Sequence, residues 1–224
     1  MAQVQEEVWE NSKKGEGPCD GCPNEKGRFN HPGFFNTEAD ILVVEECPSK
    51  NHFNFPNYDR SNDYEWYKHY FEEVNGGSIA KWPPVRLFLA PIFSEFGYTR
   101  EDVFDLVFMT SAVKCPTNNL RKSYGHCGSY LERELEEFDP EVVITAGKKP
   151  TKWTAHLLGV PRSETRALSI SKPEWWGLSD FDSDIPMIHA PHWGYYNTHH
   201  RLSDDEWDHV IESVQSGLRS VGFE

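Results

Sequence analysis

The amino-acid sequence predicts an α/β fold, a three-layer α/β/α sandwich around a short, mostly parallel, four-stranded sheet. Two observations carry this prediction. Short apolar runs rich in Val and Ile recur along the chain, and segments with a helical spacing of apolar residues lie between them. Strands of a parallel sheet are covered by helices on both faces, so they are continuous apolar runs.

Four such runs are predicted as strands: residues 40–44, 104–110, 142–147 and 186–189. In sheets of this kind, functional groups collect at the carboxyl ends of the strands, where loops emerge and helices begin. The residues that follow each run are therefore the candidates for a site.

Helices are predicted between and after these strands. Residues 85–96 form an apolar helix that Pro91 breaks or kinks, because proline lacks the N–H that a helix needs. Residues 125–138 and 150–158 are two further helices, and residues 203–221 close the chain. A capping box and one apolar stripe mark the last helix: Ser203 with Glu206, then Trp207, Val210, Ile211, Val214 and Leu218.

The ends of the chain suggest one domain. Residues 1–17 mix charges with glycine, so we expect a mobile polar tail followed by a single domain at residues 18–224. The start lacks the apolar core of a signal peptide, and no apolar run is long enough to cross a membrane. We expect a cytoplasmic monomer.

The composition is strongly acidic. Asp and Glu number 36 against 22 Lys and Arg, which gives a formal net charge of -14. Such a protein repels nucleic acid over about 10 Å at roughly 0.1 M salt but over only about 3 Å at molar salt. The charge therefore fits a halophilic protein in a very salty cytoplasm; an ordinary acidic protein is the alternative.

Five cysteines without an export signal favour a metal or a reactive thiol over disulfides. Cys19 and Cys22 form a C-x-x-C pair in Gly- and Pro-rich sequence, and Cys115 and Cys127 lie far downstream. Four converging thiolates suit either a [4Fe–4S] cluster or a structural zinc ion, and the spacing does not decide between them. Alternatively, the cysteines are small buried apolar residues.

Several motifs, taken in order, resemble those of the iron–sulfur uracil-DNA glycosylases. They are Gly17-Pro18-Cys19-Asp20-Gly21-Cys22, Val113-Lys114-Cys115-Pro116, Cys127-Gly128-Ser129-Tyr130-Leu131 and Asp139-Pro140-Glu141-Val142-Val143-Ile144-Thr145-Ala146-Gly147-Lys148. The likeness runs from about Cys19 to His192. It implies that family's fold, DNA as partner, and a structural [4Fe–4S] cluster with Cys19, Cys22, Cys115 and Cys127 as ligands.

The resemblance also implies a catalytic pair. Glu46 aligns with the family's motif glutamate, and it would stabilise the cationic sugar and hold the attacking water; without the resemblance, Glu45-Glu46 is simply an acidic turn. His192 aligns with the family's histidine and would donate a hydrogen bond to the departing base, with His189 as the alternative. Cys47 and Pro48 would line the pocket, and Trp193 replaces the usual proline.

The resemblance places two further groups at the base. Phe53 or Phe55 would stack on the base rotated out of the duplex, with Phe55 favoured and a core role as the alternative. Ser111 stands where the family has an asparagine that reads the uracil edge, and a hydroxyl replaces the planar amide there. The excised base would thus be uracil or a related damaged base.

The charge pattern supports a DNA partner. Neither Asp nor Glu occurs between Asp105 and Glu132 or between Glu141 and Glu164. The cations that we expect to contact phosphates lie in these gaps: Lys114, Arg121, Lys122, Lys148 and Lys149. Chance and the burial of strands are the alternative explanation.

We therefore expect a hydrolase of DNA base-excision repair, which cuts the N-glycosidic bond of uracil or a related damaged base. Two other functions fit the same residues. One is a DNA-binding protein of this fold that has lost the chemistry, and the other is an interaction protein stabilised by zinc.

Overall fold

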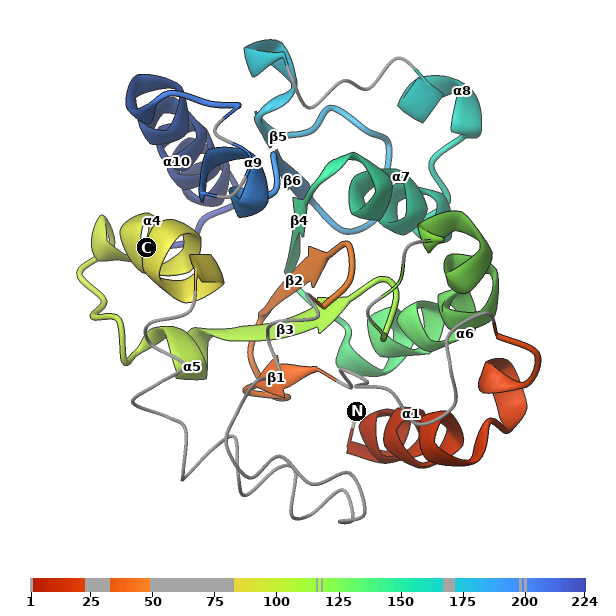
Figure 1. Cartoon of the computed structure of the whole chain (residues 1–224). Helices are drawn as coiled ribbons and strands as arrows, with labels where there is room; N and C mark the ends of the chain where they lie inside the picture. Colours follow the sequence, from red (N-terminus) through yellow and green to blue (C-terminus); the bar gives the residue numbers. More distant parts are fainter. Residues whose placement is uncertain are drawn as a thin grey trace.

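The computed structural model describes residues 2–22, 33–48, 83–115, 117, 119–166, 172–197, 199 and 201–224. Within these ranges, helices flank a six-stranded sheet with the strand order β1-β3-β2-β4-β6-β5 (Figure 1). The predicted α/β class is confirmed. The strands are β1 (Phe34–Phe35), β2 (Ile41–Glu45), β3 (Val107–Ser111), β4 (Val142–Ala146), β5 (Gly177–Leu178) and β6 (Met187–Ala190).

The four central strands are the four that the sequence predicts, and they run parallel. β2 pairs with β3 on one side and β4 on the other, and β4 pairs with β6. β3 begins later than predicted, because Val103–Leu106 is the short helix α5. A four-stranded sheet was too few: β1 and β5 add antiparallel edges. A strand of two residues is too short to show the alternating pattern by which strands are recognised in a sequence.

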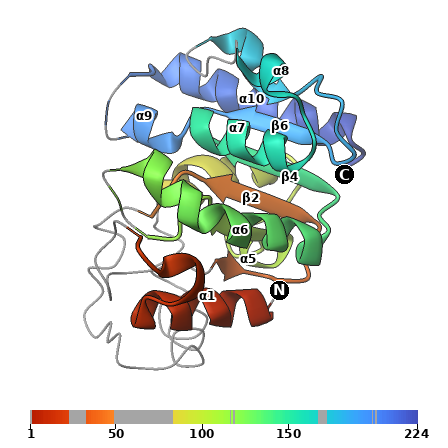
Figure 2. The ribbon, with the colours of Figure 1, turned by 90° about the vertical axis from the view of Figure 1, so that its right-hand side faces the viewer.

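Helices cover both faces of the sheet (Figure 2). The strand side chains alternate between two apolar cores. Ile41 and Val43 of β2 face the layer that contains α4 and α10, whereas Leu42 and Val44 face α6 and α7. None of the described helices is long and apolar enough to cross a membrane. The helices that cover the sheet are α4 (Ala90–Ser94), α6 (Leu120–Phe138), α7 (Lys148–Leu157) and α10 (Asp204–Ser220). Three short helices are α8 (Arg162–Arg166), η4 (Pro173–Trp175) and α9 (Trp193–Asn197).

The helix predicted to be disturbed at Pro91 is a π-helical turn, η3 (Pro84–Leu89), that runs into α4. Proline cannot donate a backbone hydrogen bond to the carbonyl of Leu87, four residues earlier. That carbonyl accepts instead from Trp207 Nε1 of α10 at 2.9 Å. The proline thus leaves an acceptor through which the two helices are joined.

The closing helix α10 begins as predicted. The Ser203 side chain accepts from the backbone of Glu206, and the Glu206 side chain accepts from the backbone of Ser203, which is a complete capping box. The five residues of the predicted apolar stripe are buried.

The chain does not start with a mobile tail, so this prediction is wrong. Residues Ala2–Lys14 form helix α1, which packs against α6. Val4, Val8 and Trp9 of α1 are buried. They make a stripe only one or two residues wide among polar side chains, which is why the helical period is hard to recognise in the sequence.

Lys114 is buried, which corrects the prediction that it contacts DNA. Its ammonium donates to the carboxylate of Glu134 and to Thr110 Oγ1. Burial raises the pKa of Glu134, and the charge and hydrogen bond of Lys114 oppose that rise. The sequence does not reveal this pair, because Glu134 lies twenty positions away on α6.

His189 of β6 is also buried, on the face covered by α7. Its Nδ1 lies 3.3 Å from Thr145 Oγ1 of β4. Burial lowers the pKa of His189 to about 4, because the charged imidazolium is poorly solvated there, although Asp180 partly offsets the effect. The folded protein therefore holds this side chain neutral.

We predict that Lys114→Met lowers the free energy of unfolding by about 3–5 kcal/mol, because it leaves the buried Glu134 carboxylate without its cation. Urea unfolding followed by circular dichroism measures the change. Lys122→Met, at an exposed position of α6, is the matched control and should stay close to wild type. A Lys114→Met protein as stable as that control would contradict the account of the pair.

Acid should destabilise the fold through His189. The unfolded state binds its proton near pH 6.5 and the folded state only near 4, so the free energy of unfolding falls as the pH drops through this interval, by about 3 kcal/mol in all. His189→Gln should flatten this part of the stability profile. His156→Gln, at an exposed position of α7, should leave it unchanged. Equal slopes in all three proteins would count against the assignment.

Candidate active site

Three parallel strands deliver polar side chains to one edge of the sheet. Glu45 ends β2 and pairs in register with Ser111, which ends β3. His192 follows β6, and the backbone N–H of Gly147, after β4, donates to the carbonyl of Ala190 at 2.8 Å. Gly147 has φ of 111°, which an L side chain rarely adopts, and this turn lies against the His192 Cβ.

Glu45 is the most buried acid of this edge, and the sequence analysis gave it no role. Its side chain is 1% exposed. Ser111 Oγ donates to Glu45 Oε1 at 2.8 Å, so the predicted base-reading serine is bound to a carboxylate. Glu45 Oε2 has no hydrogen-bond partner within the described residues. The one sequence signal for this group is its position at the end of an apolar strand.

His192 faces the same carboxylate. Its Nδ1 accepts from the backbone N–H of Gly194 at 2.9 Å, which assigns the proton of the neutral ring to Nε2. Nε2 lies 3.7 Å from Glu45 Oε2, too far for a hydrogen bond. The ring also packs against Trp193, with centroids 4.2 Å apart. His192 therefore presents a donor toward the Glu45 side chain.

Glu46, the predicted catalytic carboxylate, lies at the same edge but points elsewhere. Its Oε1 is 3.8 Å from Lys149 Nζ, and the two side chains are 32% and 48% exposed. An exposed ion pair at this distance contributes little to stability and opens readily. Glu46 is therefore accessible to a ligand.

The other residues predicted for the base pocket are only partly described. Cys47 is half-buried and Pro48 is buried. Burial raises the pKa of Cys47 to about 12, with Glu45 and Glu46 adding to the rise, so the thiol stays protonated. The predicted stacking residues, Phe53 and Phe55, lie outside the described residues.

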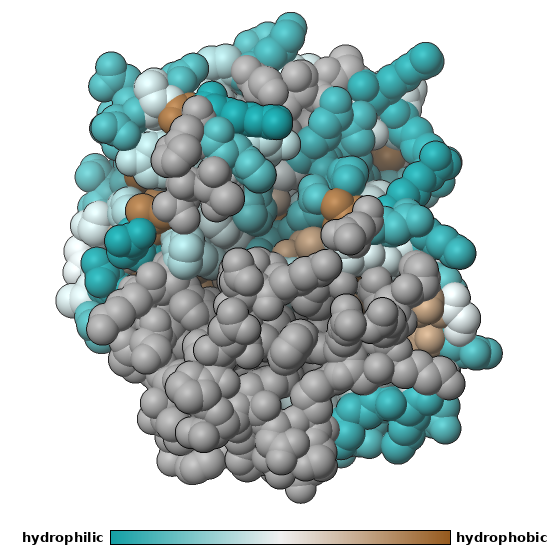
Figure 3. All heavy atoms as spheres, in the orientation of Figure 1, coloured by the Kyte–Doolittle hydropathy of each residue, from teal (hydrophilic) through white to brown (hydrophobic). Residues whose placement is uncertain are grey.

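The remaining predicted DNA contacts lie in the first turns of two helices. Arg121 and Lys122 are exposed at the start of α6, and Lys148 and Lys149 are exposed at the start of α7. Tyr124 stacks on Trp153 with centroids 4.0 Å apart, which ties α6 to α7. In the face shown in Figure 3, the described surface is largely hydrophilic.

Cys19, Cys22 and Cys127 lie close to one another at α6, and Cys115 lies next to them. Burial raises the pKa of Cys127 to about 12; the backbone and charge of Lys114 lower it, and Cys19 and Cys22 raise it further. Cys19 belongs to the 3₁₀ turn η1 (Gly17–Cys19), which packs on α6. Cys115 directly follows Lys114, whose backbone bonds to Cys127. All four predicted ligands thus lie around the start of α6.

These thiols do not form a closed ligand sphere. Across the described ranges, which hold every cysteine, no three Cys, His, Asp or Glu side chains gather closely enough to hold a metal ion. A single zinc ion needs four ligands, with each sulfur about 2.3 Å from the metal. The donor chemistry, cysteine thiols gathered around one helix, fits a thiolate-bound group.

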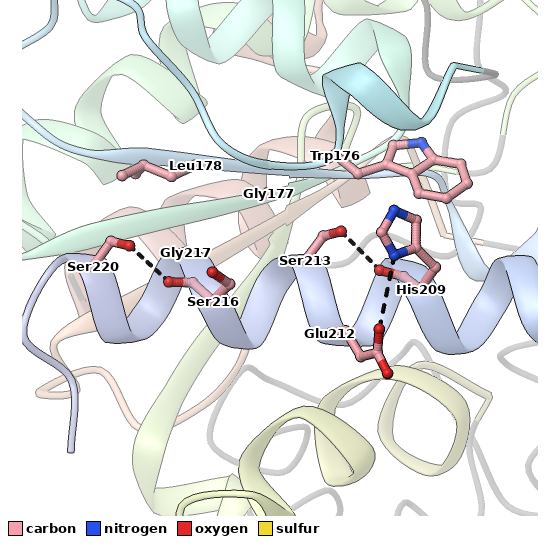
Figure 4. Close-up of a pocket in the computed structure, with 9 residues that line it drawn as sticks. All are labelled: Trp176, Gly177, Leu178, His209, Glu212, Ser213, Ser216, Gly217 and Ser220. Carbon is pink, nitrogen blue, oxygen red and sulfur yellow. Dashed lines mark hydrogen bonds and ion pairs between the residues drawn. The ribbon is translucent and has the colours of Figure 1, made fainter.

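A groove of about 400 Å³ lies away from this edge, between β5 and α10 (Figure 4). Two of its three serine hydroxyls are already used: Ser213 donates to the carbonyl of His209 at 2.7 Å, and Ser220 donates to that of Ser216 at 2.9 Å. A Cβ at Gly177 would come within 2.8 Å of the Ser213 carbonyl oxygen. The small residues here allow β5 to pack closely on the helix.

Comparison with known proteins matches this sequence to one family. The family model described as the uracil DNA glycosylase superfamily matches residues 32–215. The type-4 uracil-DNA glycosylase of Saccharolobus solfataricus is 29% identical over 204 residues, which cover 88% of this chain and 82% of that protein. The type-4 uracil-DNA glycosylase of Archaeoglobus fulgidus is 27% identical over 148 residues, which cover 62% of this chain and 59% of that protein. The chain belongs to the uracil DNA glycosylase superfamily.

Proposed function

We propose that this protein is a DNA repair glycosylase that hydrolyses the N-glycosidic bond of uracil or a related damaged base. One observation carries the proposal: two carboxylates, a hydroxyl and an imidazole meet at the carboxyl edge of the parallel sheet. Family membership and the two type-4 relatives support it.

The reaction builds positive charge on the sugar and leaves the bonding electrons on the base, so an enzyme must stabilise both. Glu46 suits the sugar side. Its carboxylate is reachable from solvent and is held only by the weak pair with Lys149. An ionised Glu46 would stabilise the cationic sugar and orient the attacking water.

His192 suits the base side. With the proton on Nε2, the ring donates without needing to be charged. A base oxygen that approaches Nε2 would receive this hydrogen bond as negative charge develops. The exposed Arg121, Lys122, Lys148 and Lys149 would hold phosphates around the site.

Cys19, Cys22, Cys115 and Cys127 would hold a [4Fe–4S] cluster. Such a cluster carries its cysteines on the outside of an iron–sulfide core, so they stand further apart than the ligands of one zinc ion. When bound, the cluster would supply a structural tie. It would join η1 to the start of α6, where Arg121 and Lys122 emerge.

A non-catalytic DNA-binding function is the second candidate. The hydroxyl of Ser111 is bound to Glu45, and Glu46 is paired with Lys149, so both groups must rearrange before they contact a substrate. In this function, DNA would bind and no bond would break.

We predict that Glu46→Gln lowers the rate of base excision at least about a hundredfold, with DNA binding preserved. The assay measures abasic product from single- and double-stranded DNA with uracil, hypoxanthine or 5-hydroxycytosine, in high salt. Glu141→Gln is the matched control, because this exposed acid lies before β4, at the opposite edge of the sheet. Wild-type protein that binds these strands and forms no abasic product would establish the non-catalytic alternative.

Iron should be lost when a proposed ligand is removed. We expect anaerobically purified wild-type protein to absorb visible light as iron–sulfur proteins do, and Cys127→Ser to lose most of its iron and sulfide. Cys47→Ser should retain both, since the proposal gives Cys47 no ligand role. Stoichiometric zinc without iron in the wild type would favour the zinc-stabilised interaction protein.

A further inference from the structure

The two oxygens of the Glu45 carboxylate differ in their hydrogen bonding. Its Oε1 accepts from Ser111 at 2.8 Å, and its Oε2 has no hydrogen-bond partner among the described residues, although the side chain is 1% exposed. A buried carboxylate without partners for both oxygens is unfavourable. The nearby Lys149 pairs instead with the neighbouring Glu46. A donor from a bound ligand would give this oxygen the hydrogen bond that it lacks among the described residues.

The place of this oxygen decides which ligand can reach it. Glu45 ends β2, Ser111 ends β3, and His192 follows β6, so Oε2 lies at the sheet edge where the proposed reaction takes place. It lies 3.7 Å from His192 Nε2, the group assigned to the base. A base held by His192 would therefore present its edge to Glu45.

We propose that Glu45 reads the edge of the bound base, and that it favours a base with an amino group beside a ring nitrogen over uracil. This inference rests on the proposed function and deepens it by naming the class of base. An ionised carboxylate only accepts hydrogen bonds. The amino group of a cytosine- or adenine-type edge donates, whereas a uracil-type edge presents a carbonyl oxygen at the same place and donates only from the adjacent ring N–H.

The charge of the departing base points the same way. When the N-glycosidic bond breaks, its electron pair goes to the base nitrogen, so an unprotonated base leaves as an anion. A buried carboxylate beside it raises the energy of that anion. A base already protonated on a ring nitrogen leaves neutral, and before it leaves it donates to the carboxylate from both its ring N–H and its amino group. Glu45 therefore favours bases that accept a proton.

Matched probes test this proposal without requiring excision. A thymine-only strand carries a single 2′-fluoroarabino nucleotide, which resists hydrolysis, with either cytosine or uracil as its base. We expect the wild-type protein to bind the cytosine probe roughly tenfold to a hundredfold more tightly than the uracil probe. Glu45→Gln, whose amide both donates and accepts, should bring the two affinities within about twofold of each other.

Two controls complete the design. Glu141→Gln changes the same charge at the opposite edge of the sheet and should keep the wild-type preference. Circular dichroism checks that Glu45→Gln is folded. Equal binding of the two probes by the wild-type protein, including no binding above an unmodified strand, overturns the proposal whether or not the variant folds. A folded Glu45→Gln protein that keeps the preference also overturns it.

These outcomes are separate from those of the excision assay. Failure to form abasic product from any damaged base removes the glycosylase function, whereas the probes report only how the base is read. An enzyme that excises bases but binds both probes equally keeps its function and loses the assignment of Glu45.

Discussion

The register between parallel strands determines where every proposed catalytic group lies. β2 pairs with β3 and β4 at once, so the carboxyl ends of all three strands reach the same edge. Because Glu45 is opposite Ser111 in this register, both side chains leave the sheet on one face. A slip of β2 by one residue against β3 would turn Glu45 to the other face and separate its carboxylate from the Ser111 hydroxyl. The site therefore depends on the apolar cores that fix the register.

Two buried carboxylates near this edge differ in how they are satisfied. Glu134 receives an ammonium and a hydroxyl, from Lys114 and Thr110, and this pair ties the end of β3 to α6. Glu45 receives a single hydroxyl and keeps one oxygen open. Both carboxylates keep one oxygen without a hydrogen-bond partner among the described residues, Glu134 Oε1 and Glu45 Oε2. Glu134 is balanced by the buried Lys114, whereas Glu45 faces the imidazole of His192 at the proposed site.

The sequence predicts those parts of the fold that depend on local pattern. The central strands are Val- and Ile-rich runs, and α10 carries its own capping box, so both are recognisable without tertiary contacts. The sequence does not reveal helix α1, because Val4 and Val8 are buried only against Tyr130 of α6, and Trp9 only within the larger apolar core. The role of Lys114 is not recognisable from the sequence for the same reason, because its cationic side chain is buried only through its ion pair with Glu134.

The candidate site also contains residues that the sequence predicts and one that it does not. The motifs that carry the family resemblance locate Glu46 and His192, which follow strands, and the four cysteines, which come close to one another around α6. They do not locate Glu45, whose proposed role comes from its burial, its hydrogen bond with Ser111 at the end of β3 and its closeness to His192 after β6. An acid at the end of an apolar strand is usually solvated. Here the pairing of β2 with β3 places it beside Ser111 and 3.7 Å from His192 Nε2, where we propose that it contacts the bound base. In a chain that is acidic overall, Glu45 is thus an acidic side chain that is buried at the proposed substrate site.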